Sequence, residues 1–109
     1  MRNNPIEELT DMTQKLVDLI FTKSEKQLIT DILLNECGSN LPLCESWNYK
    51  QFERIRFAVI KLSEGQIDKF QYAVKLANMD WRDLLVVVGF AVDINSSNEW
   101  AKKIQSNLN

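Results

Sequence analysis

The stretch Asp80–Phe90, DWRDLLVVVGF, decides the fold class because its residues suit either a buried β-strand or a helix. Its valines favour a strand, but no other segment offers a strand partner, and an unpaired strand would leave buried backbone groups unsatisfied. In a helix, Asp80 is a good N-cap, and Asp83, three residues later, forms an Asp version of the capping box. We therefore predict a central helix at about 81–91, apolar nearly all round and covered by its neighbours on several sides.

Apolar residues recur at helical spacing along the rest of the chain, and each such segment is bounded by a cap or stop residue. The first segment begins with Pro5 in its first turn, and the second begins with a capping box of Ser24 and Gln27 and stops at Gly38. The expected helices lie in the stretches 3–21, 24–38, 49–65, 66–79 and 95–109. Their expected core faces include Ile6, Leu9, Met12, Leu16 and Ile20 in the first stretch, Leu28, Ile32 and Leu33 in the second, Phe52, Ile55, Val59 and Leu62 in the third, and Ile67, Phe70, Val74 and Ala77 in the fourth.

Composition agrees with a helical protein of one domain. The chain has 109 residues, of which 45% are hydrophobic and 26% charged, with only three glycines and two prolines. These values argue against disordered or turn-rich all-β classes. We predict an all-α, single-domain bundle of about five to six short helices over residues 1–109. No secretory signal and no apolar run of membrane-spanning length is visible, so we expect a cytoplasmic protein with no membrane partner.

The cysteine and histidine counts argue against a metal site and against the commonest catalytic groups. Cys37 and Cys44 are the only thiols, and the chain has no histidine. Two thiols fall short of the four ligands that structural zinc takes, and without histidine neither a Ser-His-Asp nor a Cys-His arrangement is possible. We expect no metal, no cofactor and no catalytic residue. The two cysteines flank GSNLPL and are either bridged or free, with free thiols favoured in the cytosol.

Charge is unevenly distributed along the chain. Residues 1–45 carry eight acidic against four basic side chains, whereas the remainder carries nine basic against seven acidic ones. An acidic surface repels phosphate backbones and attracts basic partners, so we expect no nucleic-acid binding. The acidic candidates for partner contact are Glu7, Glu8, Asp11 and Asp18. The alternative interpretation is that they form the solvated face of an amphipathic helix.

Trp47 and Tyr49 are the aromatic candidates for partner contact. They lie beside the irregular segment 38–48, and aromatic residues next to such a loop are typical binding anchors. They are equally consistent with residues that pack the loop against the core. The charged residues Glu53, Arg54 and Arg56 suggest a phosphate clamp, but a structural role, with Arg56 paired to Asp80 or Asp83, explains them as well.

Three motifs, ERIRFAVIKLSEGQIDKF (53–70), DWRDLL (80–85) and GFAVD (89–93), are followed by Trp100. This layout resembles a family of small bacterial helical proteins that are mostly uncharacterised. The resemblance implies a helical protein of the kind found beside secreted toxins, where small acidic proteins act as immunity partners. The chain departs from the pattern at Val87 and Val88, where smaller residues are expected, and in lacking a histidine before the last tryptophan. No catalytic residue carries over from the family.

These observations predict a non-catalytic binding protein, most concretely an immunity protein that binds and neutralises a basic domain of a cognate bacterial toxin. The alternative is a small regulatory domain or an enzyme that uses carboxylates with Arg56 or Arg82 in a helical cleft. The oligomeric state is left open by the sequence.

Overall fold

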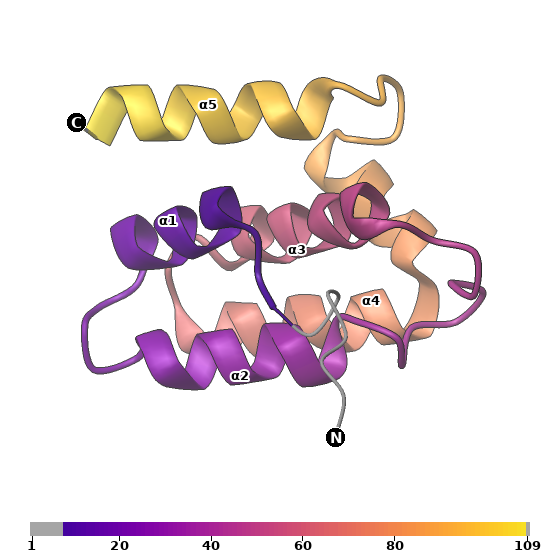
Figure 1. Cartoon of the computed structure of the whole chain (residues 1–109), viewed down its shortest axis with the longest axis horizontal. Coiled ribbons are helices and arrows are strands. Elements are labelled where there is room, and N and C mark those ends of the chain that lie inside the picture. The colour runs from indigo at the N-terminus through magenta and orange to yellow at the C-terminus, as the bar shows by residue number, and fades with distance from the viewer. Residues whose placement is uncertain (1–7, 109) are drawn as a thin grey trace.

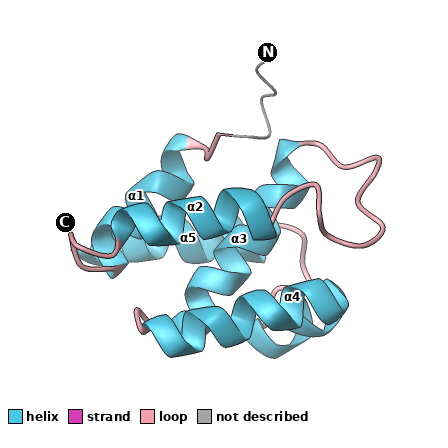
Figure 2. Ribbon diagram, turned by 90° about the horizontal axis from the view of Figure 1, so that it is seen from below, coloured by secondary structure: helices cyan, strands magenta, loops and turns pink. Residues whose placement is uncertain are grey.

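Every element in the described part of the chain is a helix, as Figure 1 and Figure 2 show. The computed structural model describes residues 8–108, and five helices follow one another within them. They are α1 (Asp11–Ile20), α2 (Lys26–Glu36), α3 (Tyr49–Ser63), α4 (Ile67–Val88) and α5 (Ser96–Leu108). The Cα radius of gyration is 12.9 Å, close to the value of about 13 Å expected for one compact domain of this length. The predicted all-α single-domain bundle is confirmed.

The centre of the fold is α3. It packs against α1, α4 and α5, and its largest interface is with α4. Figure 1 shows α5 along one side of α1 and α3, with α2 and α4 on the opposite side. Eight of the fifteen residues of α3 are buried, and they include the whole run Arg56–Ile60. A helix covered on so many sides needs apolar residues around most of its circumference, which this run supplies.

Asp80 divides α4 into two halves. Its backbone is extended, with φ of −164° and ψ of 97°, between helical residues on both sides. Its Oδ1 accepts a hydrogen bond from the backbone N–H of Arg82 at 3.0 Å, which makes Asp80 the N-cap of the second half, as predicted. The Asp83 carboxylate accepts no hydrogen bond within residues 8–108, so only the Asp80 half of the predicted capping box forms. The two halves correspond to the separate helices that the sequence predicts.

The second half of α4 is helical but not central, which corrects the prediction for 81–91. It ends at Val88, and the next residue, Gly89, takes a left-handed φ of 84°. Val86 and Val87 are 65% and 60% exposed. The buried side consists of Leu84, Leu85 and Val88. Since α4 packs mainly against α3, one side of this apolar helix is covered and the other faces outward.

The first two helices also differ from the sequence-based predictions. Helix α1 begins at Asp11, because Thr10 is its N-cap and accepts a hydrogen bond from the N–H of Thr13 at 3.2 Å. The predicted start at Pro5 lies outside the described residues. In α2 the predicted capping box does not form, since no side chain caps the helix at Glu25. Its buried residues are Ile29 and Leu33, whereas the predicted core residue Leu28 is exposed.

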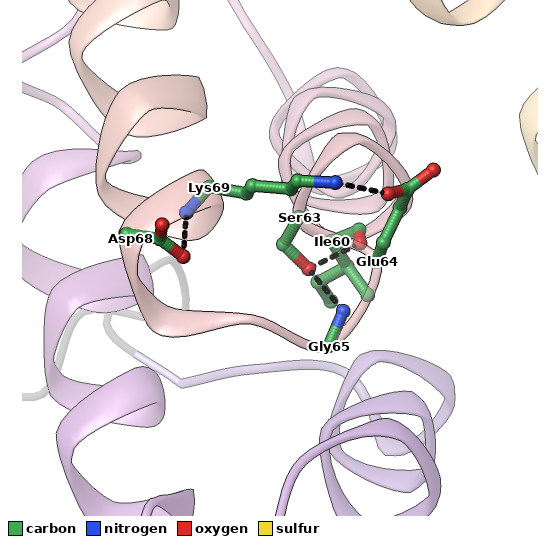
Figure 3. A network of polar contacts seen from close by, with 6 residues as sticks. All are labelled: Ile60, Ser63, Glu64, Gly65, Asp68 and Lys69. Carbon is green, nitrogen blue, oxygen red and sulfur yellow. Dashed lines mark hydrogen bonds and ion pairs between the residues drawn. The ribbon is translucent and has the colours of Figure 1, made fainter.

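The turn between α3 and α4 is held by its own side chains, as Figure 3 shows. The Ser63 hydroxyl donates to the Ile60 carbonyl at 2.6 Å and accepts from the Gly65 N–H at 3.1 Å. Glu64 and Gly65 both have positive φ, 53° and 78°. Lys69 Nζ bonds Glu64 Oε1 at 2.5 Å across the turn. These contacts reverse the chain within three residues and hold α3 and α4 as an antiparallel pair.

Candidate functional site

Three of the four acidic candidates lie in the described part of the chain, while Glu7 lies outside it. Glu8 is exposed just before α1, and Asp11 is the exposed first residue of that helix. Asp18 is exposed in the last turn of α1 and forms an ion pair with Lys26 Nζ at 3.4 Å. Asp11 and Asp18 therefore lie at opposite ends of α1, and the charge of Asp18 is partly neutralised.

A hydrogen bond links the start of α1 to α3. The hydroxyl of Thr10, the N-cap of α1, donates to the carboxylate of Glu53. Glu53 lies one helical turn beyond the exposed aromatic residue Tyr49. The structure thereby brings the acidic residues Glu8 and Asp11 to the same end of α3 as Tyr49, although about forty positions separate them in the sequence.

Trp47 is partly buried and packs the loop between α2 and α3 against the core. Its ring lies 4.8 Å from the ring of Trp81 and 5.3 Å from that of Phe52, both edge to face. The Trp81 indole N–H donates to the Pro42 carbonyl at 2.8 Å. These contacts agree with the interpretation that Trp47 packs the loop against the core. Tyr49, in contrast, is 55% exposed. A hollow of about 80 Å³ adjoins both tryptophans.

The charged residues at the start of the second half of α4 serve the helix. Besides capping, Asp80 accepts a hydrogen bond from Arg82 Nε at 3.0 Å. This bond to Arg82 holds the pKa of the Asp80 carboxyl below its usual range. The sequence-based pairing of Arg56 with Asp80 or Asp83 does not form in the described residues. Arg56 is instead buried beneath the end of α2, where its Nε donates to the Cys37 carbonyl at 3.1 Å.

Both cysteines are buried free thiols. Burial raises the pKa of the Cys37 thiol to about 12. Cys44 also has a raised pKa, chiefly through burial, and its Sγ lies 3.6 Å from the Ser39 carbonyl and 3.8 Å from that of Gly38. A thiol kept in its protonated form is a poor nucleophile and a poor metal ligand. The two cysteines therefore behave as core residues.

A cleft of about 180 Å³ lies between the N-terminal part of α3 and the start of α5. We call it the α3–α5 cleft, and it is lined by Lys50, Gln51, Glu53, Arg54, Ile94, Asn95, Ser97 and Asn98. The guanidinium of Arg54 is held in place by a hydrogen bond from Nη2 to the Phe90 carbonyl at 2.6 Å. Ser97 is only 3% exposed. Cavities that hold metabolites usually measure about 300–1,000 Å³, so this one is suited to a single side chain or a small ion.

Sequence reasoning missed this cleft as a unit. Lys50 and Arg54 are four residues apart on α3 and therefore share a helix face. Glu53 and Arg54, which the sequence suggests as parts of a phosphate clamp with Arg56, both line the cleft, whereas Arg56 does not. On α5, the sequence around Ser97 is polar but carries no sign of a cleft.

The segment from Val86 to Ile94 exposes four β-branched aliphatic side chains, and we call it the aliphatic segment. Val86 and Val87 lie in the last turn of α4, and Val92 and Ile94, in the following loop, are 97% and 75% exposed. In Figure 1 this part of the chain runs from α4 past the end of α3 to α5. Ile94 also lines the α3–α5 cleft, so the aliphatic segment and the cleft are continuous.

Comparison with known proteins yields no match to a family model, to a curated protein or to a solved structure. Within residues 8–108, no helix has the length and hydropathy needed to cross a membrane. The same residues contain no group of three or more acidic, cysteine or histidine side chains placed to hold a metal ion. The described residues offer three surface features as candidates for function: the aliphatic segment, the α3–α5 cleft, and the acidic end of α1, which lies at the same end of α3 as Tyr49.

Proposed function

We propose that this protein is a non-catalytic binding protein whose partner is another protein, and most concretely an immunity protein that neutralises a cognate bacterial toxin. The aliphatic segment is the observation that carries the proposal. Single exposed apolar residues are common on protein surfaces, but four exposed β-branched residues within nine positions make a concentration typical of protein interfaces.

Burial of this segment supplies part of the free energy that a specific complex requires. Burying a Val or Ile side chain that was fully exposed contributes about 1.5–3 kcal/mol. Val92 and Ile94, at 97% and 75% exposure, approach that limit. The two valines at the end of α4 add a smaller share. Together they supply a substantial part of the roughly 8 kcal/mol that a micromolar dissociation constant requires, before the costs of association are subtracted.

The toxin-immunity form of the proposal is supported by the sequence resemblance and by the acidic end of α1. Glu8 and Asp11 are exposed, and the bond from Thr10 to Glu53 joins the start of α1 to the end of α3 that carries Tyr49. A basic partner docking at this end would meet negative charge and an exposed aromatic side chain. Complementary charge of this kind accelerates encounter with a basic domain.

Co-expression with a candidate toxin encoded by a neighbouring gene tests the proposal. We expect a stable complex on gel filtration and rescue of growth. Replacing Val92 and Ile94 by serine should weaken the complex without lowering the melting temperature, because both side chains are exposed. Met79→Ser is the matched control, since Met79 is 73% exposed on the other side of the break in α4. Absence of both complex and rescue would exclude the immunity role.

The acidic contribution is tested separately. Asp11→Lys should slow association at low salt and lose this effect at high salt, where exposed charges are screened. Glu45→Lys makes the same change of charge on the exposed loop before α3 and serves as the control. Equal association rates for the two variants would remove Asp11 from the interface.

A further inference from the structure

Helix α5 begins with backbone donors that have no acceptor. The N–H of Ser96 bonds the Asp93 carbonyl, and that of Glu99 bonds the Asn95 carbonyl, each at 3.0 Å. Between them, the N–H groups of Ser97 and Asn98 donate no hydrogen bond within residues 8–108. Both residues line the α3–α5 cleft. Unpaired amides at the start of a helix attract negative charge, because the helix dipole adds to their own partial charge.

The side chain of Ser97 is a second and independent sign of a missing partner. This residue is 3% exposed and lines the cleft, yet its hydroxyl forms no hydrogen bond with any described residue. Polar side chains of residues this buried are usually hydrogen-bonded, and the remaining accessible surface of Ser97 lies in the cleft. An acceptor that entered the cleft would satisfy the hydroxyl and the adjacent amides together.

The opposite wall of the cleft is cationic. Lys50 and Arg54 line it one helical turn apart, and neither forms an ion pair within the described part of the chain. Arg54 Nε is buried without an acceptor there, and the bond from Nη2 to Phe90 fixes the position of the guanidinium. The Arg54 guanidinium has lost part of its hydration. An anion in the cleft would offset this loss by electrostatic attraction, and it need not bond to Nε directly.

The charge and size of the cleft select a particular anion. Its lining holds two cations and one carboxylate, that of Glu53, so its formal charge is +1. A single carboxylate balances this charge, whereas a phosphate dianion would exceed it. A volume of about 180 Å³ suits one acidic side chain. The exposed Ile94 at the edge provides an apolar contact for the residue next to it in a polypeptide.

We propose that the α3–α5 cleft binds the carboxylate of an aspartate or glutamate side chain presented by the partner polypeptide. This inference rests on the proposed protein-binding function and adds the chemistry of one contact. The carboxylate lies between the start of α5 and the two cations of α3, with an apolar neighbour against Ile94. Glu53 lines the cleft and also accepts the hydrogen bond from Thr10, so the cleft adjoins the acidic end of α1. One partner can therefore present basic residues to α1 and an acidic residue to the cleft.

Titration of the isolated protein with capped tripeptides tests this proposal. The NMR signals of the Ser97 and Asn98 amides report binding. The probe is N-acetyl Val-Glu-Val amide, and its Val-Gln-Val counterpart is the control. We expect the glutamate peptide to shift both amide signals and to bind at least about tenfold more tightly than the glutamine peptide, because charge-assisted hydrogen bonds are lost in the latter. Acetate and inorganic phosphate, titrated in parallel, should each bind more weakly than the glutamate peptide.

Variants assign the binding to the cleft. Ser97→Ala and Lys50→Gln should each weaken the glutamate peptide several-fold while leaving the melting temperature unchanged, since neither side chain forms a hydrogen bond or ion pair within residues 8–108. Lys75→Gln removes an exposed lysine from α4 and should change nothing.

Four results would overturn the proposal: no amide shift with any probe, equal binding of the two peptides, tighter binding of phosphate or acetate, or unaltered binding by Ser97→Ala and Lys50→Gln. None of them bears on complex formation through Val92 and Ile94, so failure here is distinguishable from failure of the proposed function.

Discussion

Two substitutions in the second half of α4 should have very different effects on stability. Leu84 is completely buried, whereas Val87, three positions later, is 60% exposed. Leu84→Ala should cost about 2–5 kcal/mol through lost burial and the cavity that remains. That is a large part of the roughly 5–15 kcal/mol by which a domain of this size is stable.

Val87→Ala should be nearly neutral. Removal of two carbons would cost about 1.6 kcal/mol at a fully buried site. At a site about two-fifths buried, this falls to about 0.6 kcal/mol. Alanine has a higher helix propensity than valine by a similar amount, about 0.5 kcal/mol, so the two effects cancel.

Urea unfolding followed by circular dichroism measures both variants. With a slope of about 1–3 kcal/mol per molar, Leu84→Ala should lower the midpoint by about 1 M or more, while Val87→Ala should leave it almost unchanged. If the two substitutions cost the same, this helix is covered on all sides. The exposed aliphatic segment, and with it the main support for the proposed function, would then be wrong.

Three further predictions concern individual residues. Cys37, whose buried thiol has a pKa of about 12, should resist alkylation in the native protein at pH 8 and react fully in urea; rapid native labelling would contradict its burial. Gly65→Ala should destabilise more than Gly89→Ala in thermal melts, because both residues have positive φ but a methyl group at Gly65 would lie 3.0 Å from the Ile20 carbonyl oxygen, while Gly89 has no neighbour within 4 Å; equal costs would show that φ alone decides. Asp80 has a lowered pKa in the folded protein, so its carboxylate stabilises the fold above its ordinary pKa of about 4, and this contribution is lost as the pH falls through the lower, folded-state value. The stability difference between wild type and Asp80→Asn should therefore be constant near neutral pH and shrink in acid, and a constant difference down to pH 2 would refute the assignment.

The helices that could be predicted most closely from the sequence are those whose signals agree at both ends. In α3, Asn48 accepts hydrogen bonds from the amides of Lys50 and Gln51, and the Gln51 side chain accepts from the Asn48 N–H at 2.8 Å. The apolar spacing and the stop at Gly65 complete the pattern. With cap, periodicity and stop all consistent, little freedom is left for tertiary structure to alter the helix.

The predictions failed where neighbouring residues were chemically equivalent. Leu28 and Ile29 are both apolar, so the pattern of α2 alone does not say which one faces the core. Which side of α4 stays exposed, and therefore whether Val86 and Val87 are buried, depends on how α4 packs against α3. The local sequence does not encode that packing. The α3–α5 cleft is harder still to predict. Arg54 and Ser97 are 43 positions apart, and only the folded chain brings their donors to one place.

The packing of α5 against α1 has a consequence for synthesis of the protein on the ribosome. A chain that emerges from its N-terminal end presents α1 long before α5 exists. During that interval the side of α1 that α5 covers stays open to water, and the contacts that close it have the greatest sequence separation in the bundle. We expect α2 and the α3–α4 pair to associate first and α5 to dock last, which leaves apolar residues of α1 available to chaperones until α5 has been synthesised.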